Sequence, residues 1–360
     1  MAVIYEVNMS WEENVRLVTP YVPGEQPKEK NIIKLNTNEN PYPPSPEAAK
    51  VLKGFDAELL KKYPDPNVTL LRESIAKYHG VKTSQVFAGV GSDDVLGMAF
   101  LTFFGGEEPV LFPDLTYSFY PVWSELYRIP FTEIPLDDTF RIRPSDYRIP
   151  CGGVIFPNPN APTGIYETKE VIREILNDHP DVVVIVDEAY IDFAGENASV
   201  LDLIPEYENL LVTRTFSKSR SMAGARIAYA VGSEKLIDYL MAIRNSYNSY
   251  TMNSVSIAAG VASVEDDGYF RESVEKIKTT RDRFTEEIRA MGFTVLPSSA
   301  NFVFAAPPAP HTAEEVFLKA REKGIYFRHF SSLRANPYLR ITIGTDEEMD
   351  QVLRFFREEI

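Results

Sequence analysis

Val183-Val184-Ile185-Val186-Asp187-Glu188-Ala189-Tyr190 and, further along the chain, Thr215-Phe216-Ser217-Lys218 decide how this sequence is interpreted. The run at 182–186 is unbroken, apolar and rich in β-branched residues, which predicts a strand buried on both faces of a parallel sheet. Asp187 and Tyr190 follow it at the strand's carboxyl end, where open α/β sheets bind ligands. A second apolar strand at 209–213 leads to Lys218. A carboxylate, a phenol and an amine are therefore expected at one edge of one sheet.

These groups are the ones that a pyridoxal 5′-phosphate (PLP) site needs. A lysine amine bonds to the cofactor's aldehyde, a carboxylate keeps the ring nitrogen protonated, and a hydroxyl donor stabilises the ring oxygen. Arg226 follows the small-residue turn at 223–225 and could reach the cofactor phosphate. Alone, Asp187 would be interpreted as a capping or turn residue and Lys218 as an exposed charge. Their occurrence together, in this order, favours the PLP site.

With these residues the sequence resembles the fold-type I, aspartate-aminotransferase-like PLP enzymes, and within them the histidinol-phosphate aminotransferase family, from about Val18 onward. The resemblance implies an α/β fold: a large domain with a mostly parallel sheet and a smaller C-terminal α+β domain. It further implies a homodimer with both active sites at the interface. The implied reaction exchanges an amino group between histidinol phosphate and 2-oxoglutarate in histidine biosynthesis. Lys218, Asp187 and Tyr190 would be its catalytic residues.

The composition excludes several other classes of protein. A net charge of -15 over 360 residues argues against a nucleic-acid binder, which would show a basic face. The single cysteine, Cys151, excludes an intramolecular disulfide and, with four histidines, makes a Cys/His metal cluster implausible. No apolar run approaches the roughly 20 residues of a membrane span, and the first residues include acids rather than a basic signal sequence. A cytoplasmic protein without metal, membrane or nucleic-acid partner is expected.

A glycine turn that feeds a helix predicts where the cofactor phosphate binds. The strand at 85–90 is followed by Gly91-Ser92-Asp93-Asp94 and a helix, whose first N–H groups suit a phosphate. Ser92 or Asp93 could instead simply cap the helix. The resemblance assigns the phosphate to Ser92 and Asp93, mainly through their backbone amides. It also implies that Tyr117, after the strand at 110–112, stacks on the cofactor ring.

The other cofactor residues are implied by the resemblance alone. Asn158 lies in the proline-rich turn at 157–164, which on its own indicates only a rigid turn. The resemblance gives Asn158 a hydrogen bond to the ring oxygen, and Ala161 departs from the family pattern at a position not expected to touch the cofactor. Thr215 and Ser217 complete the cofactor set. Tyr63, in Tyr-Pro-Asp, would reach the cofactor of the partner subunit.

Four residues are expected to bind substrate. Arg328 and Arg340 lie in predicted strands; such arginines more often form surface ion pairs, but both match family positions that hold the substrate's anionic end. Tyr21 belongs to an N-terminal arm interrupted by prolines. The resemblance implies that it closes over the substrate, and the sequence alone is equally compatible with packing against the main domain. Asn40 lies in a turn that stops at Pro41, so local turn chemistry is its alternative role.

The chain divides into an arm at 1–30, a large PLP-binding domain at 31–245 and a small domain at 246–360. Strands and helices alternate from 85 to 231, which predicts a parallel sheet with right-handed crossovers. The polar segment 245–250 is expected to be the hinge. Two helical segments, 253–265 and 269–291, follow it, and the second has the mixed charges of a solvated face.

Three other functions compete with the leading interpretation. A PLP lyase such as threonine-phosphate decarboxylase would share the cofactor residues, but the segments 35–41 and 338–345 favour an aminotransferase. An aromatic amino-acid aminotransferase would share both the fold and part of the substrate range. The aminotransferase-like sensor domain of a transcription regulator would need an attached DNA-binding domain, for which this acidic chain has no room. The preferred amino donor stays open.

Overall fold

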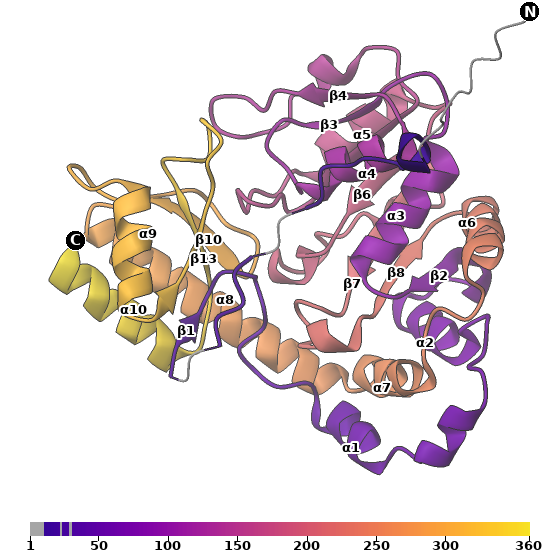
Figure 1. Cartoon of the computed structure of the whole chain (residues 1–360), viewed down its shortest axis with the longest axis horizontal. Coiled ribbons are helices and arrows are strands. Elements are labelled where there is room, and N and C mark those ends of the chain that lie inside the picture. Colours follow the sequence, from indigo (N-terminus) through magenta and orange to yellow (C-terminus); the bar gives the residue numbers. More distant parts are fainter. Residues whose placement is uncertain (1–10, 22–23, 29–30) are drawn as a thin grey trace, which may run out of the picture.

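A seven-stranded sheet forms the centre of the computed structural model, which describes residues 11–21, 24–28 and 31–360 (Figure 1). Its strand order is β2-β8-β7-β6-β5-β3-β4. The strands are β2 (Val86–Gly89), β3 (Val110–Pro113), β4 (Phe131–Ile134), β5 (Gly153–Pro157), β6 (Val184–Asp187), β7 (Leu210–Thr215) and β8 (Ala228–Val231). The two apolar runs around which the sequence was interpreted are thus neighbouring strands, β6 and β7.

The sheet is parallel except at β8, which runs antiparallel to both β2 and β7. The prediction of a mostly parallel α/β sheet is confirmed, but the expected strand–helix alternation up to residue 231 is wrong at this strand. The cause is the connection between β7 and β8. Residues 216–227 form the lysine loop and contain one short 3-10 helix, Ala223–Ala225, in place of the helix that a parallel crossover usually needs.

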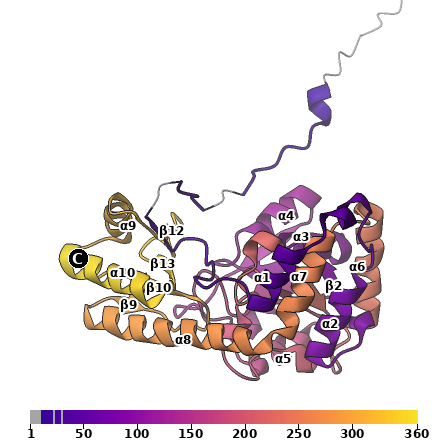
Figure 2. The same ribbon diagram turned by 90° about the horizontal axis from the view of Figure 1, so that it is seen from below.

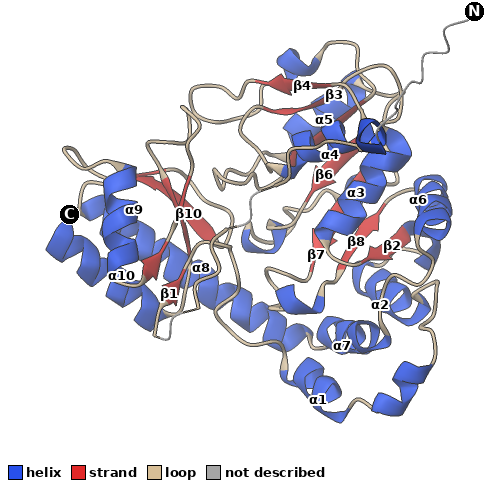
Figure 3. Cartoon of the chain, viewed as in Figure 1, coloured by secondary structure: helices blue, strands red, loops and turns tan. Residues whose placement is uncertain are grey.

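Helices cover both faces of the large sheet (Figure 3). Side chains alternate along each strand, so Val184 and Val186 of β6 pack on one face and Ile185 on the other. The first face packs against α2 (Thr69–His79), α5 (Lys169–Asp178) and α7 (Ser254–Glu265), and the second against α3 (Ser92–Phe103), α4 (Phe119–Tyr127) and α6 (Glu234–Tyr247). Burial on both faces explains why β6 lacks any polar residue before Asp187.

The C-terminal part of the chain builds a second core at one end of the large sheet (Figure 2). Its antiparallel sheet has the order β12-β13-β10-β9, and three helices accompany it. These elements are β9 (Thr294–Val295), β10 (Phe302–Ala306), β12 (Arg328–His329), β13 (Leu339–Thr342), α8 (Asp267–Ala290), α9 (Ala313–Glu322) and α10 (Asp346–Glu359). The long helix α8 runs from the large domain along the whole smaller core.

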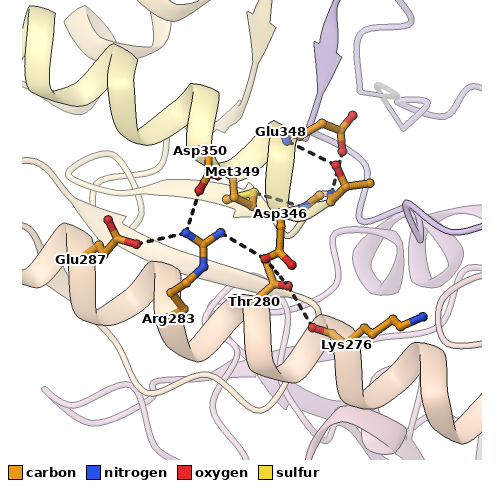
Figure 4. A network of polar contacts seen from close by, with 10 residues as sticks. Lys276, Thr280, Arg283, Glu287, Asp346, Glu348, Met349 and Asp350 are labelled. Carbon is orange, nitrogen blue, oxygen red and sulfur yellow. Dashed lines mark hydrogen bonds and ion pairs between the residues drawn. The ribbon is translucent and has the colours of Figure 1, made fainter.

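Arg283 fastens α8 to α10. Its guanidinium donates to Asp350 at 2.7 Å and to Asp346 at 3.1 Å, while Glu287 of its own helix accepts at 3.1 Å (Figure 4). The Thr280 hydroxyl on the same face of α8 lies 3.0 Å from the Asp346 carboxylate and 2.9 Å from the backbone oxygen of Lys276. The mixed charges of this helix therefore serve partly as a polar contact between two helices as well as a solvated face.

Two segments, β1 (Ile33–Lys34) and α7, pack against the other domain than the one to which the predicted boundary at 245/246 assigns them. β1 pairs in parallel with β11 (Ile325–Tyr326) of the smaller core. α7 packs on α1 (Pro46–Gly54) and α2, within the large core. The division itself stays a prediction, and this packing favours moving the start of the smaller domain to α8. No helix within the described ranges is both long and apolar enough to cross a membrane.

Candidate active site

Asp187 ends β6 at the carboxyl edge of the sheet, with 5% of its surface exposed. The hydroxyl groups of Thr213 and Tyr120 donate to its carboxylate at 3.1 and 3.4 Å. Burial raises the pKa of Asp187 to about 6 despite these donors. A buried carboxylate of this kind favours a cationic partner, because the opposite charge stabilises its ionised form.

Lys218 lies beyond the end of β7, and its amine points toward the segment that contains Thr37. Its Nζ donates to the carbonyl oxygen of Thr37 at 3.0 Å and lies 5.7 Å from the centre of the Tyr190 ring. The side-chain amide of Asn40 donates to the carbonyl oxygens of Lys218 and Ser219 at 3.1 and 3.2 Å. Asn40 therefore holds the lysine loop in place; its predicted contact with substrate stays a prediction.

The turn predicted to bind the cofactor phosphate brings Gly91, Asp93 and Arg226 together. Gly91 has φ +87°, and a side chain at this position would lie 2.5 Å from the Arg226 guanidinium, so only glycine allows the close approach. Asp93, in the first turn of α3, accepts from Arg226 at 3.0 Å and from the Tyr117 hydroxyl at 2.8 Å. Burial and the neighbouring Asp93 raise the pKa of Tyr117. An anion at this helix start would meet the free N–H groups of α3 and the Arg226 charge.

Tyr190 is held by Asn38, a residue that the sequence analysis did not single out. The side-chain amide of Asn38 donates to the Tyr190 hydroxyl at 2.9 Å, and the Thr342 hydroxyl of β13 donates to the side-chain oxygen Oδ1 of Asn38 at 3.1 Å. Asn38 has φ +56°, a left-handed conformation that asparagine tolerates well. The cluster of asparagines before Pro41 was a signal for such a residue, but turn chemistry explained it equally well.

A second group that was not predicted, Arg214 with Asp192, holds the lysine loop at Ser219. Arg214 of β7 pairs with Asp192 and lies 3.7 Å from the buried Glu188. Asp192 also accepts from the Ser219 hydroxyl at 2.5 Å. The residue after Lys218 is thus bound by a side chain that follows β6. These contacts were not predicted, because nothing local in the sequence pairs Asp192 with Arg214.

A cavity of about 230 Å³ unites most of the predicted cofactor residues. Those that line it are Ser92, Asp93, Tyr117, Asp187, Tyr190, Thr215, Ser217, Lys218 and Arg226. Asn158 is not among the lining residues: it is fully buried, and its side-chain amide exchanges hydrogen bonds of 3.0 and 2.8 Å with the backbone of Glu167. Tyr63 lies elsewhere, 82% exposed, with its ring 4.7 Å from that of Tyr250.

The predicted substrate arginines are neighbours, because Arg328 of β12 is opposite Arg340 of β13. Arg340 donates to the Asn36 carbonyl oxygen at 2.9 Å, and its buried Nε has no hydrogen-bond partner among residues 11–21, 24–28 and 31–360. Burial lowers the pKa of Arg340, yet a guanidinium stays charged at neutral pH. Within the described part of the chain, neither arginine forms an ion pair with a carboxylate. Tyr21 stacks on Phe119, with ring centres 4.3 Å apart.

This donor set fits PLP at each of its ends. Asp187 suits a protonated ring nitrogen, Lys218 an aldehyde, and Gly91 with Arg226 a phosphate that approaches the backbone closely. The sequence model described as aminotransferase class I and II matches residues 30–356. The chain belongs to this family.

Known proteins of this family are similar over almost the whole chain. Histidinol-phosphate aminotransferase 1 of Hydrogenovibrio crunogenus is 50% identical over 344 residues, 96% of each chain. The histidinol-phosphate aminotransferase of Acinetobacter baumannii is 48% identical, over 97% of each.

Solved structures share the family fold. The PLP complex of the Sinorhizobium meliloti histidinol-phosphate aminotransferase matches with a TM-score of 0.83 at 24% identity, covering 91% of this chain and 90% of that one. Aspartate aminotransferase from Thermus thermophilus with maleate matches with a TM-score of 0.80 at 20% identity, covering 91% of each. At these identities the similarity concerns the fold, and it confirms the predicted PLP fold-type I arrangement.

Proposed function

We propose that this protein is a PLP-dependent histidinol-phosphate aminotransferase, which interconverts histidinol phosphate plus 2-oxoglutarate and imidazole acetol phosphate plus glutamate. The names of the relatives at about half identity support this substrate over the aromatic and lyase alternatives. One structural observation carries it. Arg340 is half-buried, its buried Nε has no hydrogen-bond partner among the described residues, and it lies opposite the like-charged Arg328. Such a pair needs an anion, and both histidinol phosphate and glutamate supply one.

PLP, when bound, supplies a ring that accepts electrons from the substrate's reacting carbon. Asp187 would hold the proton on the ring nitrogen, while Tyr190 and Asn158 would face the ring oxygen. Tyr117 would stack on the ring. The phosphate would bind among residues at the other end of the cavity: Ser92, Asp93, Thr215, Ser217 and Arg226. An Asp93 carboxylate already paired with Arg226 and Tyr117 would contribute its backbone amide.

Lys218 would provide both attachment and proton transfer. Its Nζ lies in the cavity beside the Thr37 carbonyl oxygen, 5.7 Å from the Tyr190 ring centre. The Lys218 amine would attach the cofactor and, in its free form, would take the proton from the substrate's Cα. Asn40 and Asp192 keep the lysine loop in place during this exchange, through Lys218 and Ser219. Proton transfer from a positioned base typically contributes about 10²- to 10⁴-fold in rate.

One assay tests the proposed reaction. The PLP-loaded protein is mixed with 2-oxoglutarate and, separately, histidinol phosphate, phenylalanine or phosphothreonine, and the products are identified. Glutamate and imidazole acetol phosphate from histidinol phosphate, at the highest kcat/KM of the three, are expected. Carbon dioxide from phosphothreonine would establish the lyase instead, and a preference for phenylalanine would establish the aromatic enzyme.

Replacing Arg340 with alanine is expected to lower kcat/KM for histidinol phosphate roughly ten- to a hundredfold, because charge-assisted contacts to the anion are lost. Arg340→Lys restores the charge without the fork and should recover part of the activity. Steady-state kinetics measure both. Arg173→Ala removes an exposed arginine paired with Glu206 and serves as the control. If Arg340→Ala and Arg328→Ala both leave these kinetics unchanged, the substrate assignment fails and the PLP assignment stands.

The homodimer and a cytoplasmic location also belong to this proposal. Support for the dimer comes from Tyr63, Leu59 and Leu60, which are all more than half exposed on one segment. Large apolar side chains gathered on one surface favour a protein partner. In the proposed dimer Tyr63 would reach the cofactor phosphate of the other subunit. The location accords with a chain whose single cysteine can form no internal disulfide.

Mixed dimers test whether Tyr63 acts across the interface. Tyr63→Ala and Lys218→Ala subunits, each of low activity, are unfolded together, refolded and assayed. If Tyr63 acts in the partner's site, the mixed dimer has one complete site, and activity should rise to roughly a quarter of wild type, given statistical pairing and dimers as the commonest assembly. No gain over the separate variants would place Tyr63 at its own subunit's site or at none. The control is Lys218→Ala protein that is unfolded and refolded alone.

A further inference from the structure

The turn between β12 and β13 contacts the large domain through Arg334. Its Nη1 donates to the Asp114 carboxylate and its Nη2 to the Asp137 carbonyl oxygen, both at 2.7 Å. The guanidinium also lies 5.0 Å from the centre of the Phe140 ring. Three contacts of one side chain, all with large-domain residues, thus join two domains at the tip of one hairpin.

The large domain presents a rigid receiving surface for this arginine. The second carboxylate oxygen of Asp114 accepts from the Leu136 amide at 3.0 Å, so Asp114 joins β3 to the segment after β4. The side chain of Asp137 accepts from the amides of Thr139 and Arg141 at 2.7 and 2.9 Å, which fixes that turn. The Arg334 contacts therefore need no rearrangement of the surface that receives them.

The hairpin held in this way is the one that bears both predicted substrate arginines. Arg328 and Arg340 are paired across β12 and β13, and within the described ranges no carboxylate neutralises either. Tyr338, two residues before Arg340, packs edge-on against Phe140 at 5.7 Å. The place of the two arginines relative to the large domain thus depends on the contacts at the hairpin tip.

We propose that Arg334 is a positioning residue, whose contact with Asp114 latches this hairpin so that Arg328 and Arg340 meet the substrate's anionic group at a fixed distance from the cofactor cavity. The inference rests on the proposed function, because it takes these two arginines as the anion site. The latch acts on substrate capture and leaves the chemistry at Lys218 unchanged. Its loss should therefore appear in KM.

The test compares Arg334→Ala and Asp114→Asn in the full-length, PLP-loaded protein. Each is expected to raise KM for histidinol phosphate roughly tenfold, because a charge-assisted contact is lost. kcat should stay within about twofold, and the absorbance spectrum of the bound cofactor should not change. The double variant should be no worse than the worse single variant, because both changes remove the same contact. Arg334→Lys keeps a cation near Asp114 but loses the fork, and should raise KM less.

Arg357→Ala is the matched control, since Arg357 forms a partly exposed ion pair with Glu287 at 2.8 Å within the smaller domain. Its KM should equal that of the wild type. An unchanged KM in both latch variants overturns the proposal, and so does a fall in kcat and melting temperature without a change in KM. If Arg340→Ala raises KM while Arg334→Ala does not, the latch alone fails. If Arg340→Ala is also without effect, the proposed anion site fails with it.

Discussion

Lys218→Ala is expected to abolish transamination, with kcat at least roughly 10⁴-fold below wild type, because the change removes both the cofactor attachment and the base. Lys218 is the only lysine among the residues lining the described cavity. No other amine there could replace it. The variant should still fold and bind PLP non-covalently through the phosphate residues, so loss of activity should occur without loss of melting temperature.

Labelling checks the same assignment independently of activity. Borohydride reduction of the PLP-loaded wild type, followed by peptide mapping, should place the pyridoxyl group on Lys218. Lys278→Ala, which removes a lysine of an ion pair with Glu275 on α8, should keep full activity and the same label. A label on Lys34 or any other lysine would contradict the catalytic assignment.

Asp187→Asn is expected to lower kcat/KM roughly 10²- to 10³-fold while PLP remains bound, because a fixed charge opposite the ring nitrogen is lost. The amide has nearly the same shape. Thr213 and Tyr120 donate to different oxygens of Asp187, so the amide oxygen can accept from one of these hydroxyls and the NH2 group can donate to the other. The Asp187→Glu variant keeps the charge but overfills a site with 5% exposure, so it separates charge from fit. Near-normal turnover in Asp187→Asn would show that this role is wrong.

Asp187→Asn should lower activity but raise the free energy of unfolding of the cofactor-free protein. Burial raises the pKa of Asp187 from its ordinary value of 3.8 to about 6, so the folded protein holds this proton more tightly than the unfolded chain. The resulting stabilisation is complete below about pH 3.8 and is lost as the pH rises to about 6. At pH 7 Asp187→Asn should therefore unfold less readily than the wild type without PLP, by about 1–3 kcal/mol. Adding PLP should stabilise the wild type more than the variant. Denaturant titrations with and without PLP measure both differences.

The elements with continuous apolar runs could be predicted from the sequence. β6 and the first half of β7 were recognisable because burial on both faces leaves a continuous apolar run, Val184–Val186 in β6 and Leu210–Val212 in β7, and the residues after each run could then be assigned to one edge. Ser92, Asp93, Tyr117, Tyr190 and Arg226 line the same cavity, although the family resemblance, and not the strand pattern, assigned Ser92, Asp93 and Tyr117 to the cofactor. Each follows or precedes a strand that the pattern located.

Contacts between distant segments could not be predicted. β1 pairs with β11 across nearly the whole chain, and the apolar residues of either strand would serve equally well in a different sheet. α7 was assigned to the smaller domain because a polar segment precedes it, whereas its buried residues pack on α1 and α2. Asn38 and Asn40 belong to one short motif, yet one holds Tyr190 and the other the lysine loop. Only the fold distinguishes the two.

The position of β8 between β2 and β7 also affects when the large sheet can be completed during synthesis. β7 and β8 are joined locally, so Lys218 and Arg226 come together soon after both strands have formed. β2 is the edge strand beside β8, and residues 90–227 separate the two in the chain. Domains emerge from the ribosome with the N-terminal part first, so β2 waits for its neighbour until most of the sheet has been made. The helix start that would bind phosphate therefore joins the lysine only after β8 has been made, and until then the facing edges of β2 and β7 stay open to wrong pairing.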